Sequence, residues 1–276
     1  SDLSAIHGGP EFANAGLPTQ LLAYDHNWDE PQYPIQVLDD PVANQYLAGA
    51  AFHGYAGDVS AQTEVRNEHP DKEIYFTEIS GGDFAPNFAD NLVWYGDNLL
   101  VGGARNWGNS VIMWNYALDP DGDPHLGGCT NCRGVVTVDG GNVTHNEEFY
   151  ALGQASKFVR PGAVRIGSTT VEGSVETTAF ENPDGSLVLL TLNPSGSSQS
   201  FRGILGTEHF QYTLPPQSLS TFVWEGEGGA TFDNGGFESG GYHTTGGSLD
   251  GWLAWGNTNN NVRVTPAAAL NGEHAL

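Results

Sequence analysis

The sequence predicts a parallel α/β region followed by an antiparallel all-β region. Short apolar runs alternate with helix-like segments over residues 1–157, and this alternation is typical of parallel βαβ units. Over residues 158–224 the apolar runs are separated by turn signals instead, which indicates a small antiparallel sandwich. A content of 38 Gly in 276 residues, with 11% aromatic residues, also favours a loop-rich, strand-containing fold over a helical bundle.

Four strands are expected in the first region. Each is a short and mostly apolar run bounded by polar residues. These runs are residues 20–25, 48–55, 73–78 and 110–115.

Three helices are expected between and after these strands. Asp40 and Pro41 form a typical helix start, and this helix continues to Tyr46. Over residues 88–99 apolar side chains recur at helical spacing and form one face. Residues 146–157 close the region as a third helix.

The second region contains four clear strand-like runs and is followed by a linker. The runs lie at residues 164–166, 176–180, 187–192 and 220–224. Residues 225–229, with the sequence EGEGG, are expected to be a linker. A new β-type segment begins at residue 230, and residues 230–276 supply only part of a sandwich.

The charge of the chain excludes several classes of partner. The sequence has 33 acidic and 9 basic residues, so its formal net charge is −24. Nucleic acids and anionic membrane surfaces both require a basic face, and we expect neither as a partner. No stretch approaches 18 consecutive apolar residues, so no transmembrane helix is expected.

Cys129 and Cys132 are the two cysteines, and they lie in a glycine-rich loop. A zinc site needs about four ligands, and no second Cys or His pair follows at suitable spacing. A redox pair of the thioredoxin type would open a helix after a strand, whereas glycines flank this pair. We expect a short disulfide in a secreted, extracellular protein. Ser1 is followed by no leader-like sequence, so a signal peptide would lie outside this chain.

Polar and aromatic residues mark the ends of all four expected strands. They are the Asp25–Trp28 stretch, His53 to Tyr55, Glu78, and Trp114 with Asn115. In a parallel α/β barrel the C-terminal strand ends converge on one face, where the chemistry takes place. Aromatic rings beside carboxylates and amides are suited to sugars, because rings pack on pyranose C–H faces while polar groups bind hydroxyls.

Several of these motifs together resemble glycoside hydrolase family 30. They are the FTEISGG stretch at 76–82, the HGY strand end at 53–55, YDHNW at 24–28 and IMWNYAL at 112–118. The resemblance covers roughly residues 15–224 and implies a retaining β-glycosidase of the glucosylceramidase and endo-β-1,6-glucanase kind. It implies the C-terminal half of a (β/α)8 TIM barrel, strands five to eight, over 1–157, followed by the sandwich.

The resemblance also implies roles for individual residues. Glu78 resembles the catalytic nucleophile, and Trp114 resembles a wall of the glycone subsite. His53 and Asn115 resemble groups that bind hydroxyls or orient the nucleophile, and Asp25, Trp28 and Tyr55 are expected near the same rim. From the residues alone, Glu78 and Asp25 could instead cap helices, and the other side chains could be ordinary packing or satisfied polar groups.

One expected motif is absent. The family's acid/base is a Glu in an Asn-Glu-Pro stretch that ends the fourth barrel strand, and this sequence has none. Asn67 and Glu68 are the nearest match to this motif. They precede the strand that carries Glu78 and so lie at the wrong end of the barrel. An eight-stranded barrel needs about 250 residues. We therefore expect the missing half of the barrel on the same polypeptide or on another chain.

The final segment resembles the start of a jelly-roll carbohydrate-binding module. The motif NGGFE at 234–238, followed by Trp252 and Trp255, carries this resemblance. The tryptophans could be core residues or a ligand platform.

The sequence thus predicts an enzyme that hydrolyses a β-glucan, with β-1,6-glucan the first candidate. The reaction would pass through a glycosyl-enzyme ester on Glu78 and would need no metal or organic cofactor. A glucosylceramidase or exo-β-glucosidase is an alternative, and it would need an apolar entrance for the lipid. A non-catalytic carbohydrate-binding protein is an alternative of a different class.

Overall fold

The computed structural model describes residues 3–224 and 261–265. The chain forms two compact units. The first contains the chain up to Ser80 together with Arg105–Trp114, and the second contains Gly81–Ala104 together with the chain from Asn115 onward.

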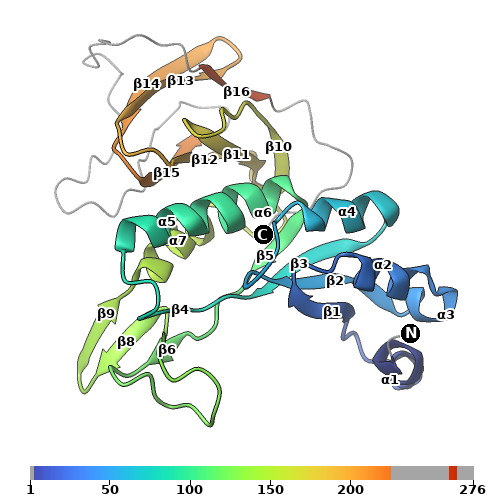
Figure 1. Cartoon of the computed structure of the whole chain (residues 1–276). Helices are drawn as coiled ribbons and strands as arrows, with labels where there is room; N and C mark the ends of the chain where they lie inside the picture. Colours follow the sequence, from blue (N-terminus) through green and yellow to red (C-terminus); the bar gives the residue numbers. More distant parts are fainter. Residues whose placement is uncertain (1–2, 225–260, 266–276) are drawn as a thin grey trace. The chain divides into compact units, whose positions relative to one another are not determined.

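A four-stranded parallel sheet with strand order β1-β2-β3-β5 forms the centre of the first unit (Figure 1). The strands are β1 (Leu21–Asn27), β2 (Leu47–His53), β3 (Glu73–Glu78) and β5 (Gly108–Val111). The helices are α1 (Leu3–Asn14), α2 (Gln32–Asp39), α3 (Pro41–Asn44) and α4 (Ala61–Glu68). Phe52 on β2 and Phe76 on β3 are at most 1% exposed, as expected for strands of a covered parallel sheet.

The first three strands agree with the sequence prediction, but the fourth does not. The expected strand over 110–115 is instead β5, which ends at Val111. The chain beyond it stays beside β3 through two separate hydrogen bonds, from Ile112 N–H to Phe76 O and from Trp114 N–H to Ile79 O, without a continuous ladder. Of the helices, α3 follows the expected start, because the Asp40 side chain accepts a hydrogen bond from Val42 N–H. The sequence reasoning missed α1, α2 and α4.

A long helical segment opens the second unit. It consists of α5 (Phe88–Tyr95), a π-helical turn (Gly96–Val101) and α6 (Gly102–Arg105), so it extends beyond the expected end at residue 99. Asn87 caps α5 by accepting hydrogen bonds from Ala89 N–H and Asp90 N–H. The expected helix after residue 146 is confirmed as α7 (Glu147–Ser156).

Short strands that were not predicted lie before α5 and between α6 and α7. The two-residue strands β4 (Gly81–Gly82) and β7 (Cys132–Arg133) pair antiparallel. A hairpin of β8 (Val136–Asp139) and β9 (Asn142–His145) turns at Gly140, whose φ of 56° favours glycine. Strand β6 (Ala117–Leu118) runs parallel to β8.

A seven-stranded sheet completes the second unit, with strand order β14-β13-β16-β10-β11-β12-β15. The strands are β10 (Val164–Ser168), β11 (Glu176–Glu181), β12 (Leu187–Asn193), β13 (Gln199–Leu205), β14 (Glu208–Leu214), β15 (Ser218–Trp224) and β16 (Asn261–Thr265). Its core holds Phe201, Phe210 and Phe222 in mutual ring contact, with centroids 4.8–5.5 Å apart.

The C-terminal segment differs in part from the expected separate module. Strand β16 lies within the sandwich sheet, parallel to β13 and antiparallel to β10. The remainder of residues 230–276, including Trp252 and Trp255, lies outside the described residues.

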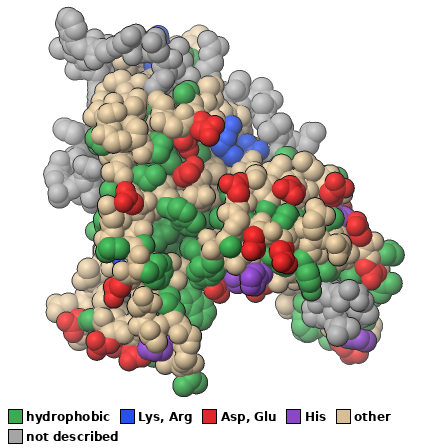
Figure 2. Space-filling model, viewed as in Figure 1, with side chains coloured by type: hydrophobic (Ala, Val, Ile, Leu, Met, Phe, Trp, Pro, Cys, Tyr) green, Lys and Arg blue, Asp and Glu red, His purple; other side chains and the backbone are tan. Residues whose placement is uncertain are grey.

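The described surface agrees with the strongly acidic composition. Figure 2 shows acidic side chains spread over the visible face, with few Lys or Arg side chains. None of the helices within the described ranges is long and apolar enough to cross a membrane.

Candidate active site

A bulge near the end of β1 shapes one side of the candidate site. Tyr24 pairs with Ala51 and His26 pairs with Phe52, so Asp25 is the extra residue between them. Tyr24 and Asp25 have φ values of 82° and 58°, a left-handed conformation that is costly for a bulky residue such as Tyr and less so for Asp. Such strain at a strand end is common where a bulge re-aims a functional side chain.

The bulge brings Asp25 into a hydrogen-bonded group with the neighbouring strands. Asp25 Oδ1 accepts from Thr77 Oγ1 at 2.7 Å and lies 3.0 Å from His53 Nε2. The His26 ring stacks beside His53, with centroids 6.1 Å apart. Burial raises the pKa of Asp25, but the hydrogen bonds from Thr77 and His53 outweigh it, and the pKa lies below its ordinary value. Asp25 is therefore held as a carboxylate.

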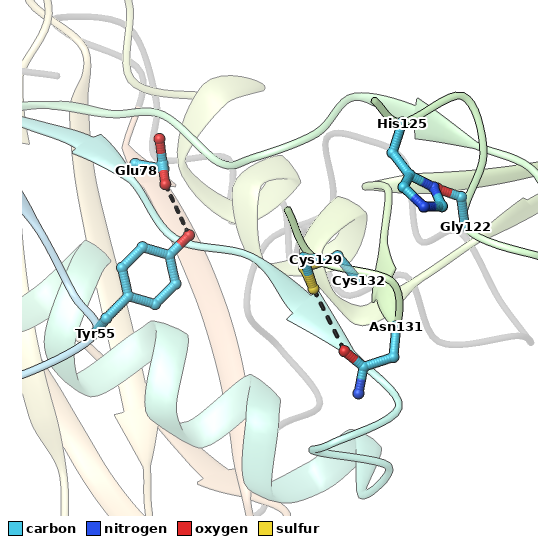
Figure 3. Close-up of a disulfide and its surroundings, with 7 residues drawn as sticks. All are labelled: Tyr55, Glu78, Gly122, His125, Cys129, Asn131 and Cys132. Atoms are coloured by element: carbon cyan, nitrogen blue, oxygen red, sulfur yellow. Dashed lines mark hydrogen bonds between the residues drawn. A yellow bond between two sulfur atoms is a disulfide. The ribbon is translucent and has the colours of Figure 1, made fainter. Parts of the chain in front are cut away.

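Glu78 lies at the C-terminal end of β3 and receives a hydrogen bond from Tyr55. Tyr55 Oη donates to Glu78 Oε1 at 3.0 Å (Figure 3). Gly54 N–H also donates to the carbonyl oxygen of Glu78, which fixes the two strand ends side by side. Burial and the contact with Glu78 raise the pKa of Tyr55 to about 12, while contacts with Ser80 lower it. The phenol is therefore a proton donor at ordinary pH.

An exposed indole lies next to this pair along the sheet. Trp114 N–H donates to Ile79 O at 2.8 Å, so the backbone of Trp114 is held one residue beyond Glu78. The side chain of Trp114 is 54% exposed, and that of Tyr55 is 48% exposed. Exposed rings beside a carboxylate provide a surface on which a sugar ring can pack.

Two other residues expected at the rim have different surroundings. Trp28 is 3% exposed and packs against Phe76, with ring centroids 5.3 Å apart, so it lies in the core of the first unit. Asn115 belongs to the second unit, where its Oδ1 accepts a hydrogen bond from Ala117 N–H at 3.2 Å. From the sequence alone, Asn115 could also be a polar residue that only makes a local hydrogen bond, and the bond to Ala117 is of this kind.

The structure adds Thr77, Asn27 and His26 to the group. Thr77 donates a hydrogen bond to Asp25, and the His26 ring stacks beside that of His53. Asn27 Oδ1 accepts a hydrogen bond from Tyr55 N–H at 3.3 Å. All three are neighbours along the chain of candidate site residues predicted from the sequence, namely Asp25, Trp28 and Glu78. The sequence could not reveal the roles of Asn27 and His26, because the bulge at Asp25 changes which side chains point the same way.

Glu68 lies at the opposite end of β3 from Glu78. It is the last residue of α4, and the chain then enters β3 at Glu73. A six-residue strand spans about 16 Å between its first and last residues. This placement agrees with the exclusion of Glu68 as an acid acting with Glu78.

The described residues form no cluster of three or more His, Cys, Asp or Glu side chains that could hold a metal. The expected disulfide is present: Cys129 and Cys132 are bonded, with their Cα atoms 5.6 Å apart (Figure 3).

Comparison with known families identifies both regions of the chain. A model of the glycosyl hydrolase family 30 TIM-barrel domain matches residues 2–159. The chain belongs to glycosyl hydrolase family 30. A model of the family 30 beta sandwich domain matches residues 162–222, so the predicted order of an α/β barrel region and a β-sandwich is confirmed.

Individual family 30 relatives are similar over most of this chain. An endo-1,6-beta-D-glucanase of Neurospora crassa is 38% identical over 71% of this chain and 42% of its own length. The endo-1,6-beta-D-glucanase neg1 of Aspergillus fumigatus is 33% identical over 78% of this chain and 44% of its own length. Glucosylceramidases, including the lysosomal acid enzyme of Mus musculus, are more distant.

A solved structure has a similar fold. The endo-beta1,6-glucanase BT3312 superimposes with a TM-score of 0.74 and 32% identity, over 81% of this chain and 52% of that chain. The chain thus spans less than half the length of the two curated glucanases and about half of this structure.

Proposed function

We propose that this chain is part of a retaining β-glycoside hydrolase that acts on a β-glucan, with Glu78 as the nucleophile. The hydrogen bond from Tyr55 to Glu78, at a strand end beside the exposed Trp114, carries this proposal. A β-1,6-linked glucan is the favoured substrate, because the endo-1,6-beta-glucanases are more similar to this chain than the glucosylceramidases are.

Glu78 would act by attack of its carboxylate on the anomeric carbon. The leaving oxygen departs with a proton from a general acid, and an ester forms between the sugar and Glu78. The same acid, now a base, then activates water to hydrolyse this ester with net retention of configuration. Tyr55, as a neutral phenol, would orient the carboxylate. His53, Asp25 and Trp114 would line the sugar site, and Trp28 would support it from the core. Asn115, the residue after Trp114 in the chain, stays a predicted hydroxyl-binding residue.

We propose that the general acid comes from outside this chain. Retaining enzymes place their two carboxyl groups about 5–5.5 Å apart. The nearby Asp25 is held ionised, which is unsuitable for an acid at neutral pH, and Glu68 lies at the other end of β3. Within the described residues, β1 and β5 each pair with a single strand. Further barrel strands, from the same polypeptide or another, would close these edges and supply the acid.

The proposal includes the cellular setting and the division of the chain. The net charge of −24 and the disulfide favour a secreted enzyme acting on a polysaccharide. The barrel region would span residues 1–157 and the sandwich residues 158–224. A linker at 225–229 would precede the last segment, whose resemblance to a carbohydrate-binding module remains a prediction.

A mechanism-based probe tests the role of Glu78. A 2-fluoro glucoside with a good leaving group forms the ester with little help from the general acid, and the fluorine slows its hydrolysis. After incubation with the protein carrying both barrel halves, peptide mapping should place the sugar on the peptide that contains Phe76–Ser80. The Glu78→Gln variant is the control and should remain unlabelled, because a neutral amide cannot attack.

Other outcomes would select other functions. Labelling of Asp25 or Glu68 would contradict the assignment of the nucleophile. Products of inverted configuration would exclude the retaining mechanism. Glucan binding without turnover by the complete protein would favour a non-catalytic carbohydrate-binding protein, and faster hydrolysis of glucosylceramide than of β-1,6-glucan would favour the lipid substrate.

A further inference from the structure

A short antiparallel ladder holds the backbone that follows Glu78. Strand β4 begins at Gly81, three residues after Glu78, and pairs with β7 through Gly81 with Arg133 and Gly82 with Cys132. The next residue, Asp83, donates its N–H to Asn131 O at 3.0 Å. Two residue pairs are too few to be stable alone, so this ladder depends on what anchors β7.

An ion cluster provides that anchor. Arg133 Nη2 lies 2.9 Å from Glu148 Oε1, and Arg133 Nε lies 3.1 Å from the same oxygen. Arg133 Nη2 also pairs with Glu147. The side chains of Glu147 and Glu148 are only 7% and 2% exposed, so Arg133 compensates two carboxylates that are largely removed from water.

Further hydrogen bonds connect this cluster to α5. Tyr95 Oη donates to Glu148 Oε1 at 2.7 Å, and Asn91 Nδ2 donates to Glu147 Oε1 at 2.7 Å. Burial and the negative charge of Glu148 raise the pKa of Tyr95, so its hydroxyl remains a donor. The two carboxylates at the start of α7 are thereby fixed by α5, and Arg133 is fixed by them.

The cluster lies directly against β4. A Cβ atom added to Gly81 would lie 1.7 Å from Glu148 Oε1 and 3.0 Å from Arg133 Nε. A side chain at this position would therefore displace the Glu148 carboxylate from its place in the ion pair. The backbone three residues from Glu78 rests on the Arg133–Glu148 pair itself.

Resting on the proposed function, we propose that Arg133 is a positioning residue of this glycosidase. By binding Glu147 and Glu148, Arg133 holds β7 against β4 and fixes the backbone that continues from Glu78. The planar guanidinium is suited to this, because it donates from Nε and Nη2 in one fixed fork, which the single ammonium of lysine cannot reproduce. A misplacement of about 1 Å at a reacting group can lower a rate by about a hundredfold.

Three variants and a matched control test this role in the protein with both barrel halves. Arg133→Met removes the charge, Arg133→Lys keeps the charge but not the fork, and Gly81→Ala disturbs the contact while keeping every charge. Arg160→Met is the control, because Arg160 pairs with Asp184 at 3.6 Å while both side chains are more than half exposed. The measurements are hydrogen exchange of residues 79–85, and kcat and KM on an activated aryl β-glucoside per mole of folded protein.

We expect Arg133→Met to speed exchange over residues 79–85 and to lower kcat about a hundredfold with KM changed less than about threefold. Arg133→Lys and Gly81→Ala should lower kcat about tenfold, and Arg160→Met should match the wild type. If Arg133→Met does not fold, Arg133→Lys and Gly81→Ala still decide the matter. Wild-type kcat in these variants, or unchanged exchange, would overturn the positioning role. Absence of turnover in the wild type itself would instead refute the proposed function.

Discussion

The phenol of Tyr55 donates its hydrogen bond to Oε1 of Glu78, while the backbone N–H of the preceding Gly54 holds the carbonyl oxygen of Glu78. The end of β2 therefore contacts the end of β3 twice, once through a side chain and once through the main chain. Because the two contacts are independent, the side-chain hydrogen bond can be removed without separating the strands.

The Tyr55→Phe variant should therefore fold normally but turn over its substrate more slowly. A hydrogen bond to a charged group contributes about 1.5–3 kcal/mol, and less where solvent competes. We expect kcat to fall by about tenfold, with little change in the melting temperature. Absorbance titration of both proteins checks the raised pKa of Tyr55, because the difference between the two titration curves should have its midpoint at a pH of about 12. Unchanged kcat would show that Tyr55 does not orient the nucleophile.

Replacing Asp25 by Asn should destabilise the protein in a pH-dependent way. The pKa of Asp25 lies below its ordinary value of 3.8, so the stabilisation from its ionised form is present above that value and is lost as the pH falls through the folded-state pKa. At pH 7 we expect Asp25→Asn to cost about 1 kcal/mol, discounted for the exposure of this carboxylate. Thermal unfolding at pH 7 and at successively lower pH values below 3.8 checks this, since the difference in melting temperature between the two proteins should shrink as the pH falls.

Removing the indole of Trp114 should weaken binding more than chemistry. An exposed aromatic ring that stacks on a sugar contributes on the order of 1 kcal/mol, so Trp114→Ala should raise KM by about five- to tenfold. Trp114→Phe, which keeps a ring, should recover part of the loss. Steady-state kinetics on β-1,6-glucan oligosaccharides would show the difference, and an unchanged KM in Trp114→Ala would place the sugar elsewhere.

Opening the disulfide should have a small effect on global stability. Cys129 and Cys132 close a very short loop, for which the entropic stabilisation is at most about 2 kcal/mol. A Cys129→Ser, Cys132→Ser double variant should therefore melt only a few degrees lower than the wild type. The ion pairs of Arg133 should hold β7 even without the bond. Global unfolding of the double variant would contradict this, as would free thiols in protein purified without reductant.

Local sequence signals predicted the central strands well. The apolar runs of β1, β2 and β3 end in polar residues, and Glu78 lies at the expected strand end. The fourth strand was misplaced because Ile112 to Trp114 reads as a strand but follows β3 with only two isolated hydrogen bonds. Periodicity describes burial along the chain, and it does not reveal where a ladder is interrupted.

The surroundings of the candidate site were less predictable. Trp28 follows three polar residues and looks like a rim residue, yet it packs on Phe76 in the core. The bulge that leaves Asp25 unpaired depends on the register between β1 and β2, which no local motif encodes. The ion pairs of Arg133 join residues 14 and 15 positions apart, and a single sequence offers no sign of such a pairing.

The strained bulge at Tyr24 and Asp25 limits how this enzyme family member can be engineered for heat resistance. Gly or Asn at position 25 would tolerate the positive φ at little cost. Either substitution would remove the carboxylate that accepts from Thr77 and contacts His53. The loss of these contacts should outweigh the relieved backbone strain, so neither substitution should raise the melting temperature at pH 7, and laboratory evolution should find its gains in the sandwich instead.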